Sequence, residues 1–338
     1  MLSILIPVYR FDVRPLVRAL FEQASRLREG WEIICMDDGS PEAWQEKNRE
    51  IRDIGDRVHY SELSKNVGRA KIRNLLAQEA RYPWLLFMDC DGMPAGPGFL
   101  RDYLAACQPG RVVVGARTYA SAPPADTERF FHWYYGKKRE ERPAAERNLH
   151  PYDAFCTFHF LCPREVFMAI LLDESLRKYG HEDTLFGFEL RKRGIVILHI
   201  DNAMVHLDVE TTDVFLQKTR QGIENLATLG RKNPALGSRL LRTYWKISPF
   251  SKVFVWGFRL FKKGMERHFH GKRPNLLLFD LYKLGWLSFF MGIHKKGPRI
   301  ARSGQALNWL GRCPLKKERG SKFGVKGPWW SGGSGYFP

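Results

Sequence analysis

The sequence lacks several features that would assign it to a specialised class of protein. It contains no stretch of about 18 uncharged apolar residues, so no membrane-spanning helix is expected. Its six cysteines show no paired spacing typical of a metal site. Several lie in apolar runs such as Ile33–Met36, which is typical of reduced, buried thiols in a cytosolic protein. The first residues enter a strand-like run without a basic leader or a cleavage site, so no signal peptide is expected.

Acidic residues are scarce in the last third of the chain. The 338 residues carry a formal net charge of +18. Residues 1–230 hold 31 Lys and Arg against 33 Asp and Glu, whereas residues 231–338 hold 23 against 3, which gives about −2 and +20. This asymmetry indicates a near-neutral globular body joined to an element that meets phosphate-rich surfaces, either lipid head groups or nucleic acid. A merely soluble basic tail is the alternative.

Short apolar runs alternate with helical patterns over the first 120 residues. This alternation predicts an α/β fold with a parallel sheet covered by helices on both faces. The predicted strands are Ser3–Val8, Trp31–Met36, Val58–Glu62, Trp84–Met88 and Arg111–Gly115. Between the first two, Pro15 suits the first turn of a helix that Gly30 is expected to end. The apolar face of that helix consists of Leu16, Leu20, Ala24 and Leu27.

The pattern changes after residue 120. The aromatic run Phe130–Tyr135 and the charged run behind it are predicted to form a long loop, functional or mobile. Order is expected to return with a strand at Ile195–Ile200 and helices from about Arg164 to Leu172 and from Asp213 to Leu229. We place the end of the first domain near residue 235. It is followed by a basic aromatic helical region at 236–310 and by a tail at 311–338 that is predicted to be disordered.

Polar residues follow four of the predicted strands. Open α/β sheets bind ligands at the carboxyl ends of their strands. The first such end carries Pro7 and Tyr9, and the Tyr9 ring either stacks on a base or packs half-buried. The second is the Asp37–Ser40 turn, in which a carboxylate such as Asp38 can accept a hydrogen bond from a base or a ribose hydroxyl.

The third and fourth ends carry groups suited to a diphosphate. Within Asn66–Asn74, Gly68 stands at a predicted helix start and Arg69 and Arg73 lie one turn apart, which fits a diphosphate or a solvated basic face. The fourth end is Asp89-Cys90-Asp91. In an extended segment its two carboxylates would point the same way, which favours a nearby cation. Mg²⁺ or Mn²⁺ takes such oxygen ligands and neutralises a leaving diphosphate.

In this order, the four motifs resemble those of the family 2 glycosyltransferases, which have the GT-A fold with a Rossmann-like mixed sheet. The resemblance covers about residues 1–235 and implies inverting, metal-dependent transfer from a nucleotide-sugar donor. The chain departs from the commonest family pattern at Arg10 and Cys90. The nucleotide-binding residues implied by the resemblance are Pro7, Tyr9, Asp38, Asn66, Gly68, Arg73 and Asp89.

The resemblance extends to residues 180–183, which are similar to the family's acidic motif near the acceptor. It implies that Asp183 is the general base and that Glu182 positions it or contacts an acceptor hydroxyl. An acidic pair at a helix N-terminus is the alternative interpretation. The resemblance also implies that His206 joins Asp89 and Asp91 in holding Mn²⁺ or Mg²⁺. A structural histidine would fit its apolar neighbours equally well.

The same resemblance implies a UDP-sugar donor, a hydroxyl acceptor on a saccharide or lipid-linked glycan, and a role in bacterial surface-glycan synthesis. A nucleotidyltransferase is the first alternative, but it would carry a Gly-rich loop after the first strand, which residues 7–11 lack. A nucleic-acid-binding protein is the second, and it would leave the four motifs unexplained. We therefore expect no nucleic-acid partner.

The basic region predicts peripheral attachment to an anionic membrane surface, at the cytoplasmic face of the inner membrane. Basic side chains would meet anionic head groups while aromatic rings enter the interface. The basic residues are Lys246, Lys252, Arg259, Lys262 and Lys263. The aromatic residues are Trp245, Phe250, Phe254, Trp256, Phe258 and Phe261. The alternative is that these rings pack against the first domain.

Overall fold

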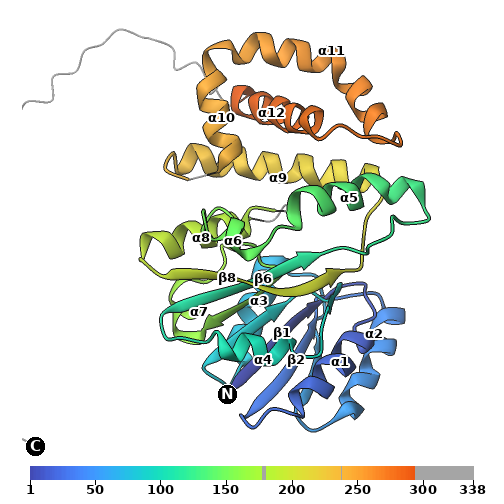
Figure 1. The fold of residues 1–338 in the computed structure, drawn as a ribbon, viewed down its shortest axis with the longest axis vertical. Coiled ribbons are helices and arrows are strands. Elements are labelled where there is room, and N and C mark those ends of the chain that lie inside the picture. Colours follow the sequence, from blue (N-terminus) through green and yellow to red (C-terminus); the bar gives the residue numbers. More distant parts are fainter. Residues whose placement is uncertain (177–179, 237, 294–338) are drawn as a thin grey trace, which may run out of the picture. The chain divides into compact units, whose positions relative to one another are not determined.

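The structure, a computed structural model, describes residues 1–176, 180–236 and 238–293 (Figure 1), and all of them belong to one compact unit. The predicted tail at 311–338 and Cys313 lie outside the described residues. The other five cysteines are free thiols, as expected, and Cys35 and Cys162 are fully buried.

One eight-stranded mixed sheet forms the centre of the fold, in the order β3-β2-β1-β4-β7-β6-β8-β5. All five strands predicted before residue 120 are confirmed. These five strands all run in the same direction, as expected, but β7 is inserted between β4 and β6 and runs antiparallel to both. The strands are β1 Leu2–Val8, β2 Trp31–Asp37, β3 Val58–Glu62, β4 Trp84–Met88, β5 Gly92–Pro94, β6 Arg111–Thr118, β7 His159–Pro163 and β8 Val196–His206.

Helices cover both faces of the sheet, and side chains of β1 alternate between the two resulting cores. Ile4 and Ile6 pack in one core with helices α1 and α4, and Leu5 packs in the other with α3, α7 and α8. This burial on both faces explains why the central strands read as nearly continuous apolar runs. The helices of this part are α1 Arg14–Ala24, α2 Glu42–Arg49, α3 Arg69–Glu79, α4 Phe99–Ala105, α6 Ala144–Arg147, α7 Arg164–Ile170 and α8 Glu182–Lys192.

Helix α1 ends six residues earlier than the sequence predicts. It stops at Ala24, where the Ser25 hydroxyl donates to the carbonyl of Phe21 at 2.8 Å and satisfies an end group of the helix. The carbonyl of Gly30 instead accepts a hydrogen bond from the backbone N–H of Leu2 at 2.9 Å. Gly30 therefore joins the start of β1 rather than ending a helix.

The prediction of a long loop between residues 120 and 141 is wrong, because most of this segment is helical. Helix α5, Phe130–Tyr135, continues into a π-helical turn, η3, at Gly136–Glu140. Phe131 is fully buried and stacks on Phe269 with ring centroids 4.8 Å apart. The aromatic run is therefore a helix that buries Phe131 and His132 and leaves its other rings partly exposed.

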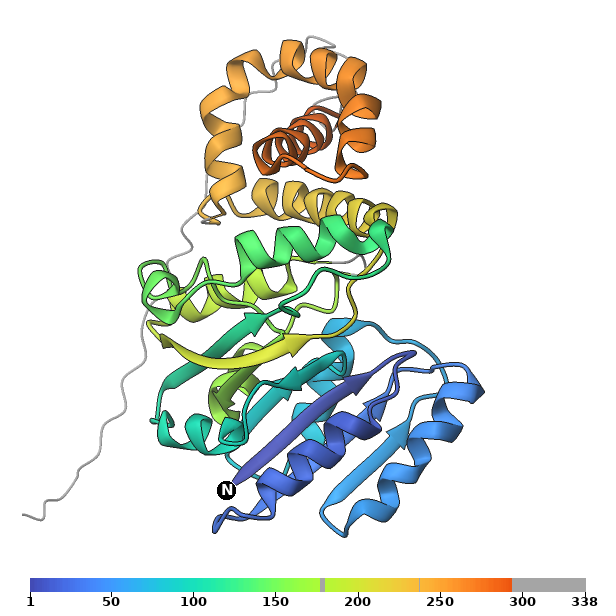
Figure 2. The same cartoon turned by 45° about the vertical axis from the view of Figure 1, so that its right-hand side comes forward.

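Four helices at the C-terminal side enclose a third core. Figure 2 shows α12, Leu276–Ile293, viewed nearly end-on between α9, Thr212–Lys232, and α11, Ser251–Phe269. Helix α10, Arg239–Ile247, also packs on α12. The predicted boundary near residue 235 stays a prediction, although α9 lies before it and shares the core of α10 to α12. None of the helices in the described ranges combines the length and apolar character needed to cross a bilayer.

We predict that Gly115→Ala destabilises the fold, because the added methyl group would collide with the His159 ring. It would also lie 2.6 Å from the carbonyl oxygen of Asn202 and the hydroxyl of Tyr103. Overpacking of this kind lowers the free energy of unfolding by about 1–3 kcal/mol. Urea denaturation measures the change. Gly96→Ala is the control, because no atom of the described residues lies within 4 Å of its added methyl group. Equal stability of the two variants would contradict the prediction.

Candidate active site

The carboxyl ends of β1 and β2 lie side by side, as the sequence predicts. The sheet register pairs Pro7 with Met36 and Val8 with Asp37. Directly after β1, the Tyr9 ring is 41% exposed, and the guanidinium of Arg10 lies 5.1 Å from its centroid. Enough of the ring is therefore accessible to stack on a base.

The turn after β2 is fixed by its own side chains. A carboxylate oxygen of Asp37 accepts a hydrogen bond from the Ser40 amide at 2.6 Å, and the Ser40 hydroxyl accepts one from the Arg10 amide at 2.8 Å. Gly39 adopts a φ of +69°, and a Cβ there would lie 2.6 Å from the backbone of Lys65. A glycine is required at this point, so the turn is held close to the loop that precedes α3.

The Asp38 carboxylate joins this turn to the same loop. Its oxygens accept hydrogen bonds from the backbone amides of Val67 at 2.6 Å and Gly68 at 3.1 Å. Burial, which outweighs these two hydrogen bonds, raises the pKa of Asp38 above its ordinary value. The structure thus gives Asp38 a positioning function, and its predicted contact with a base or ribose stays a prediction. Asn66, next to these amides, is exposed.

Two arginines at the start of α3 contact Asp89, which follows β4. Arg73 is buried, and its guanidinium donates to the Asp89 carboxylate and, at 2.9 Å, to the carbonyl of Arg69. Arg69 lies 3.6 Å from Asp89 through Nη2 and 3.1 Å from a Glu182 carboxylate oxygen through Nε. The family resemblance does not include Arg69 among the nucleotide-binding residues, but its position one turn before Arg73 already suggests a diphosphate contact.

The segment from Asp89 to Asp91 is a turn, not the extended segment expected, because the amide of Gly92 bonds back to the Asp89 carbonyl at 3.3 Å. The two carboxylates therefore take different partners. Asp89 faces the arginines, whereas Asp91 lies 3.3 Å from Nε2 of His206. Strand pairing creates this second contact, since β5 and β8 place Gly92 opposite His206.

The pair of Asp91 and His206 retains unused ligand atoms. Among the residues that the structure describes, Oδ1 of Asp91 and Nδ1 of His206 are buried and have no hydrogen-bond partner. Burial alone would raise the pKa of Asp91. The hydrogen bond to His206 and the positive charges nearby, including Arg69 and Arg117, outweigh burial, so the pKa of Asp91 lies below its ordinary value. An anionic oxygen and an imidazole nitrogen are suitable ligands for Mn²⁺. Within the described residues, no three His, Cys, Asp or Glu side chains gather as a complete metal site.

Glu182 and Asp183 begin helix α8, directly after His181 in the left-handed conformation with a φ of 73°. Burial raises the pKa of Glu182, but the charges of Arg69 and Arg73 outweigh it and hold the pKa below its usual value. Asp183 accepts a hydrogen bond from the Thr184 amide at 2.6 Å, and burial together with the charge of Glu182 raises its pKa to about 6. One of the two carboxylates is therefore held ionised, and the other is poised near neutral pH.

A cavity of about 290 Å³ brings the two sides together, with Asp89 and Arg69 on its wall alongside Glu182 and Asp183. Sequence reasoning missed another part of this wall, the ion pair of Arg117 and Glu140 at 2.9 Å. Arg117 also lies 4.3 Å over the Phe158 ring, and the hydroxyl of Tyr119 donates to Glu140. Glu140 stands in the segment that was expected to be a loop, so no pattern identified it.

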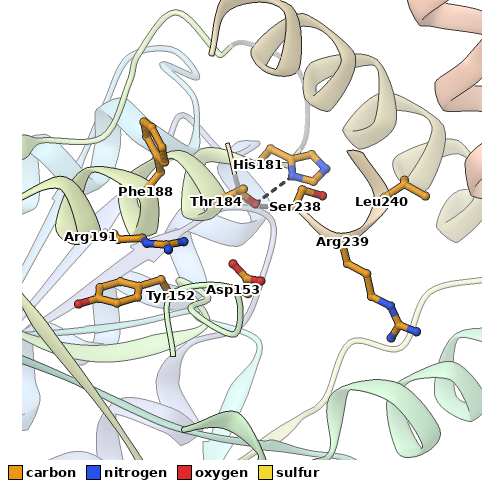
Figure 3. A pocket seen from close by; sticks show the side chains of 9 residues that line it. All are labelled: Tyr152, Asp153, His181, Thr184, Phe188, Arg191, Ser238, Arg239 and Leu240. Atoms are coloured by element: carbon orange, nitrogen blue, oxygen red, sulfur yellow. Dashed lines mark hydrogen bonds between the residues drawn. The ribbon is translucent and has the colours of Figure 1, made fainter. Parts of the chain in front are cut away.

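A second cavity of about 280 Å³ adjoins the first (Figure 3). Asp153 lines both, and in the second cavity it is joined by His181 and Thr184, whose side chains are 3.0 Å apart and hydrogen bonded. The remaining residues of its lining are Tyr152, Phe188, Arg191, Ser238, Arg239 and Leu240.

Comparisons with known proteins agree with this architecture. The mannosyltransferase PcManGT from Pyrobaculum calidifontis, solved with GDP-Man and Mn²⁺, is 12% identical and covers 86% of both chains with a TM-score of 0.58. TarS from S. aureus is 18% identical and covers 65% of this chain and 38% of its own, with a TM-score of 0.47. The likeness to PcManGT shows that the fold is mixed α/β of the GT-A type, with a helical C-terminal region.

Sequence comparison then gives the family. Residues 3–170 match the family model described as glycosyl transferase family 2. Chondroitin synthase from Escherichia coli is 23% identical over 236 residues, which cover 61% of this chain and 34% of that protein. The chain therefore spans about a third of the length of that relative. Residues 3–170 therefore form a family 2 glycosyltransferase domain, as the order of the motifs predicted.

We predict that Asp38→Ala destabilises the protein, because the amides of Val67 and Gly68 would lose their acceptor. The loss of hydrogen bonds to a buried carboxylate lowers the free energy of unfolding by about 1–3 kcal/mol. Urea denaturation at pH 7 measures it. Asp56→Ala is the matched control, since Asp56 is exposed. If both variants unfold at the same urea concentration as the unsubstituted chain, Asp38 does not hold the loop.

Proposed function

We propose that the enzyme transfers a sugar from a nucleotide-diphosphate donor, most simply UDP-sugar, to a hydroxyl group of a saccharide or lipid-linked glycan, with inversion. One observation carries this proposal: a single cavity is lined by Asp89 and Arg69, which suit a donor, and by Asp183, which suits an acceptor. The GDP-Man bound to PcManGT supports a nucleotide-sugar donor. The name of the relative, chondroitin synthase, supports a saccharide acceptor.

On the acceptor side, Asp183 takes the proton of the attacking hydroxyl. A pKa of about 6 leaves most of this carboxylate ionised at pH 7, while its affinity for a proton stays higher than that of an ordinary aspartate. Glu182 remains ionised against Arg69 and orients the start of α8. As the acceptor oxygen bonds to the anomeric carbon, the bond from that carbon to the diphosphate breaks on the opposite face, which inverts the configuration.

On the donor side, Tyr9 offers a face for the base, and Arg69 meets the charge of the diphosphate. Asp91 and His206 are the residues that would hold Mn²⁺ or Mg²⁺, because each keeps a buried ligand atom without a partner. When bound, such a cation neutralises charge on the leaving diphosphate. Asp89 is already paired with two arginines, and it would contact either the ribose of the donor or the cation. The Mn²⁺ bound to PcManGT supports the use of a divalent cation.

We predict that Asp91→Asn removes Mn²⁺-dependent transfer, because it deletes the anionic ligand next to His206. Two measurements check this: the rate against Mn²⁺ concentration, and calorimetric binding of Mn²⁺ in the presence of UDP. Asp56→Asn is a charge-matched control on the surface. Wild-type metal dependence in Asp91→Asn would show that this residue is not a ligand.

We predict that Asp183→Asn lowers the rate of transfer by at least ~10² and leaves the affinity for UDP nearly unchanged. For the unsubstituted enzyme, the rate should fall as the pH drops through about 6, since a protonated Asp183 cannot accept the proton. A raised pKa also means that the native state loses stability as pH rises from about 4 to 6. The asparagine variant should therefore be more heat-stable at pH 7. Loss of UDP binding equal to the loss of rate would assign Asp183 to the donor.

We also propose that the enzyme attaches peripherally to the cytoplasmic face of the inner membrane, through a surface formed by α10, η4 (Ser248–Phe250) and α11. Six apolar side chains on it are 46–72% exposed, namely Trp245, Phe250, Val253, Trp256, Leu260 and Phe261. The prediction is wrong for two of the aromatic rings, because Phe258 is buried and Phe254 packs against the third core. Exposed basic residues border the surface at Lys246, Lys252, Arg259 and Lys263.

The charge balance of this surface favours an anionic bilayer as its occupant. Between residues 239 and 275 the only acidic residue is Glu266, which accepts a hydrogen bond from Tyr282 and lies 4.0 Å from Lys262. Each basic residue near an anionic membrane contributes about 1 kcal/mol, and inserted aromatic rings add apolar contact. These contributions suffice for reversible attachment.

We predict that the full chain cosediments with vesicles containing anionic lipid, less so at high salt, and that Trp256→Ser with Phe261→Ser reduces binding at least about tenfold. Substitution is preferable to truncation at residue 235, because truncation would expose the core that α9 shares with α12. Leu149→Ser is the control, since Leu149 is 73% exposed elsewhere. No vesicle binding by the full chain, or equal binding by the double variant, would contradict the proposal.

A further inference from the structure

The second cavity, next to the proposed catalytic cavity, has no function in the reaction described above. The two cavities share Asp153 in their linings, and they also meet at the start of α8. Residues 181–184 are consecutive, yet Glu182 and Asp183 line the catalytic cavity while His181 and Thr184 line the second. A ligand in the second cavity therefore lies directly across the start of α8 from the proposed base.

The second cavity carries an excess of positive charge. Its one carboxylate, Asp153, is 3.1 Å from Arg242 and so is already paired. Arg191 and Arg239 also line the cavity, are exposed, and form no ion pair with a carboxylate in the described part of the chain. Arginine binds carboxylates and phosphates through two parallel hydrogen bonds. The cavity therefore favours an anion.

The rest of the lining suits a sugar ring. Figure 3 shows Tyr152, Phe188 and Arg191 on one side of the cavity and Ser238, Arg239 and Leu240 on the other, with His181 and Thr184 between them. The two aromatic rings offer apolar faces, and the hydroxyls of Thr184 and Ser238 offer polar groups. Burial lowers the pKa of His181 to about 4, so this side chain is neutral at pH 7 and can hydrogen bond to a hydroxyl. A volume of about 280 Å³ lies just below the usual range for small-molecule sites, which starts at roughly 300 Å³, and suits a single sugar unit.

We propose that the second cavity is an acceptor subsite that binds an anionic sugar unit next to the unit that carries the reacting hydroxyl. Arg191 and Arg239 bind its charged group, and Tyr152 and Phe188 contact its ring. The proposal rests on the proposed function, because it places the acceptor relative to Asp183. The charged group is a carboxylate, as in a uronic acid, or a phosphate, and both share the chemistry that arginine recognises.

Calorimetry on the full chain at pH 7 tests the subsite with defined probes. Trigalacturonate is compared with its neutral methyl ester, and glucose 6-phosphate with glucose. The unsubstituted chain should bind at least one anionic probe more tightly than its neutral partner. Since each charge-assisted hydrogen bond contributes about a factor of ten to affinity, Arg191→Gln with Arg239→Gln should weaken that binding at least about tenfold. Arg193→Gln is the matched control, because Arg193 is exposed near Arg191 but outside the cavity lining.

The outcomes separate this proposal from the proposed function. Binding of trigalacturonate alone assigns a carboxylate, binding of glucose 6-phosphate alone assigns a phosphate, and binding of both supports an anion subsite that accepts either. The subsite is wrong if neither anion binds, if the neutral partners bind as tightly, or if Arg193→Gln weakens binding as much as the double variant. UDP with Mn²⁺ is titrated into every variant. Unchanged UDP binding shows that the donor site is intact, whereas its absence from the unsubstituted chain would contradict the proposed function instead.

Discussion

The arrangement of the proposed catalytic cavity depends on the contacts of one side chain, Arg69. It lies 3.1 Å from a carboxylate oxygen of Glu182 at the start of α8 and 3.6 Å from Asp89 after β4. Glu182 is only 7% exposed, and a buried carboxylate without a cation would take up a proton. Arg69, together with Arg73, therefore keeps Glu182 charged, and that charge adds to burial in raising the pKa of Asp183. One guanidinium connects the side of the cavity that suits a donor to the side that suits an acceptor.

A series of hydrogen bonds from β2 fixes the position of Arg69. Gly39 lets the turn after β2 approach the loop before α3, and Asp38 holds the amides of Val67 and Gly68. Arg69 is the next residue and the first of α3. The motifs after β2 and β4, the start of α3 and the start of α8 are far apart in sequence, but they form one connected network.

Much of the fold and part of the site could be predicted from the sequence, because apolar runs identify strands and polar residues after them identify the edge that binds ligands. The contacts within the site could not. Whether Asp89 faces Asp91 or the arginines depends on a turn that its residues do not specify. The pair of Arg117 and Glu140 joins a strand to a π-helical turn with no motif in either. Phe258 and Trp256 are equally aromatic, and only the packing of α12 determines which is buried.

The most direct test of this account is a thermal-shift measurement with nucleoside diphosphates, with and without Mn²⁺, on the unsubstituted chain and on Arg69→Ala. A ligand that binds only the folded state raises the melting temperature, by an amount that grows with affinity. The account predicts that a nucleoside diphosphate raises the melting temperature of the unsubstituted chain, more so with Mn²⁺, and that Arg69→Ala loses most of the increase. No increase with any nucleoside diphosphate, or an equal increase in both proteins, would contradict it.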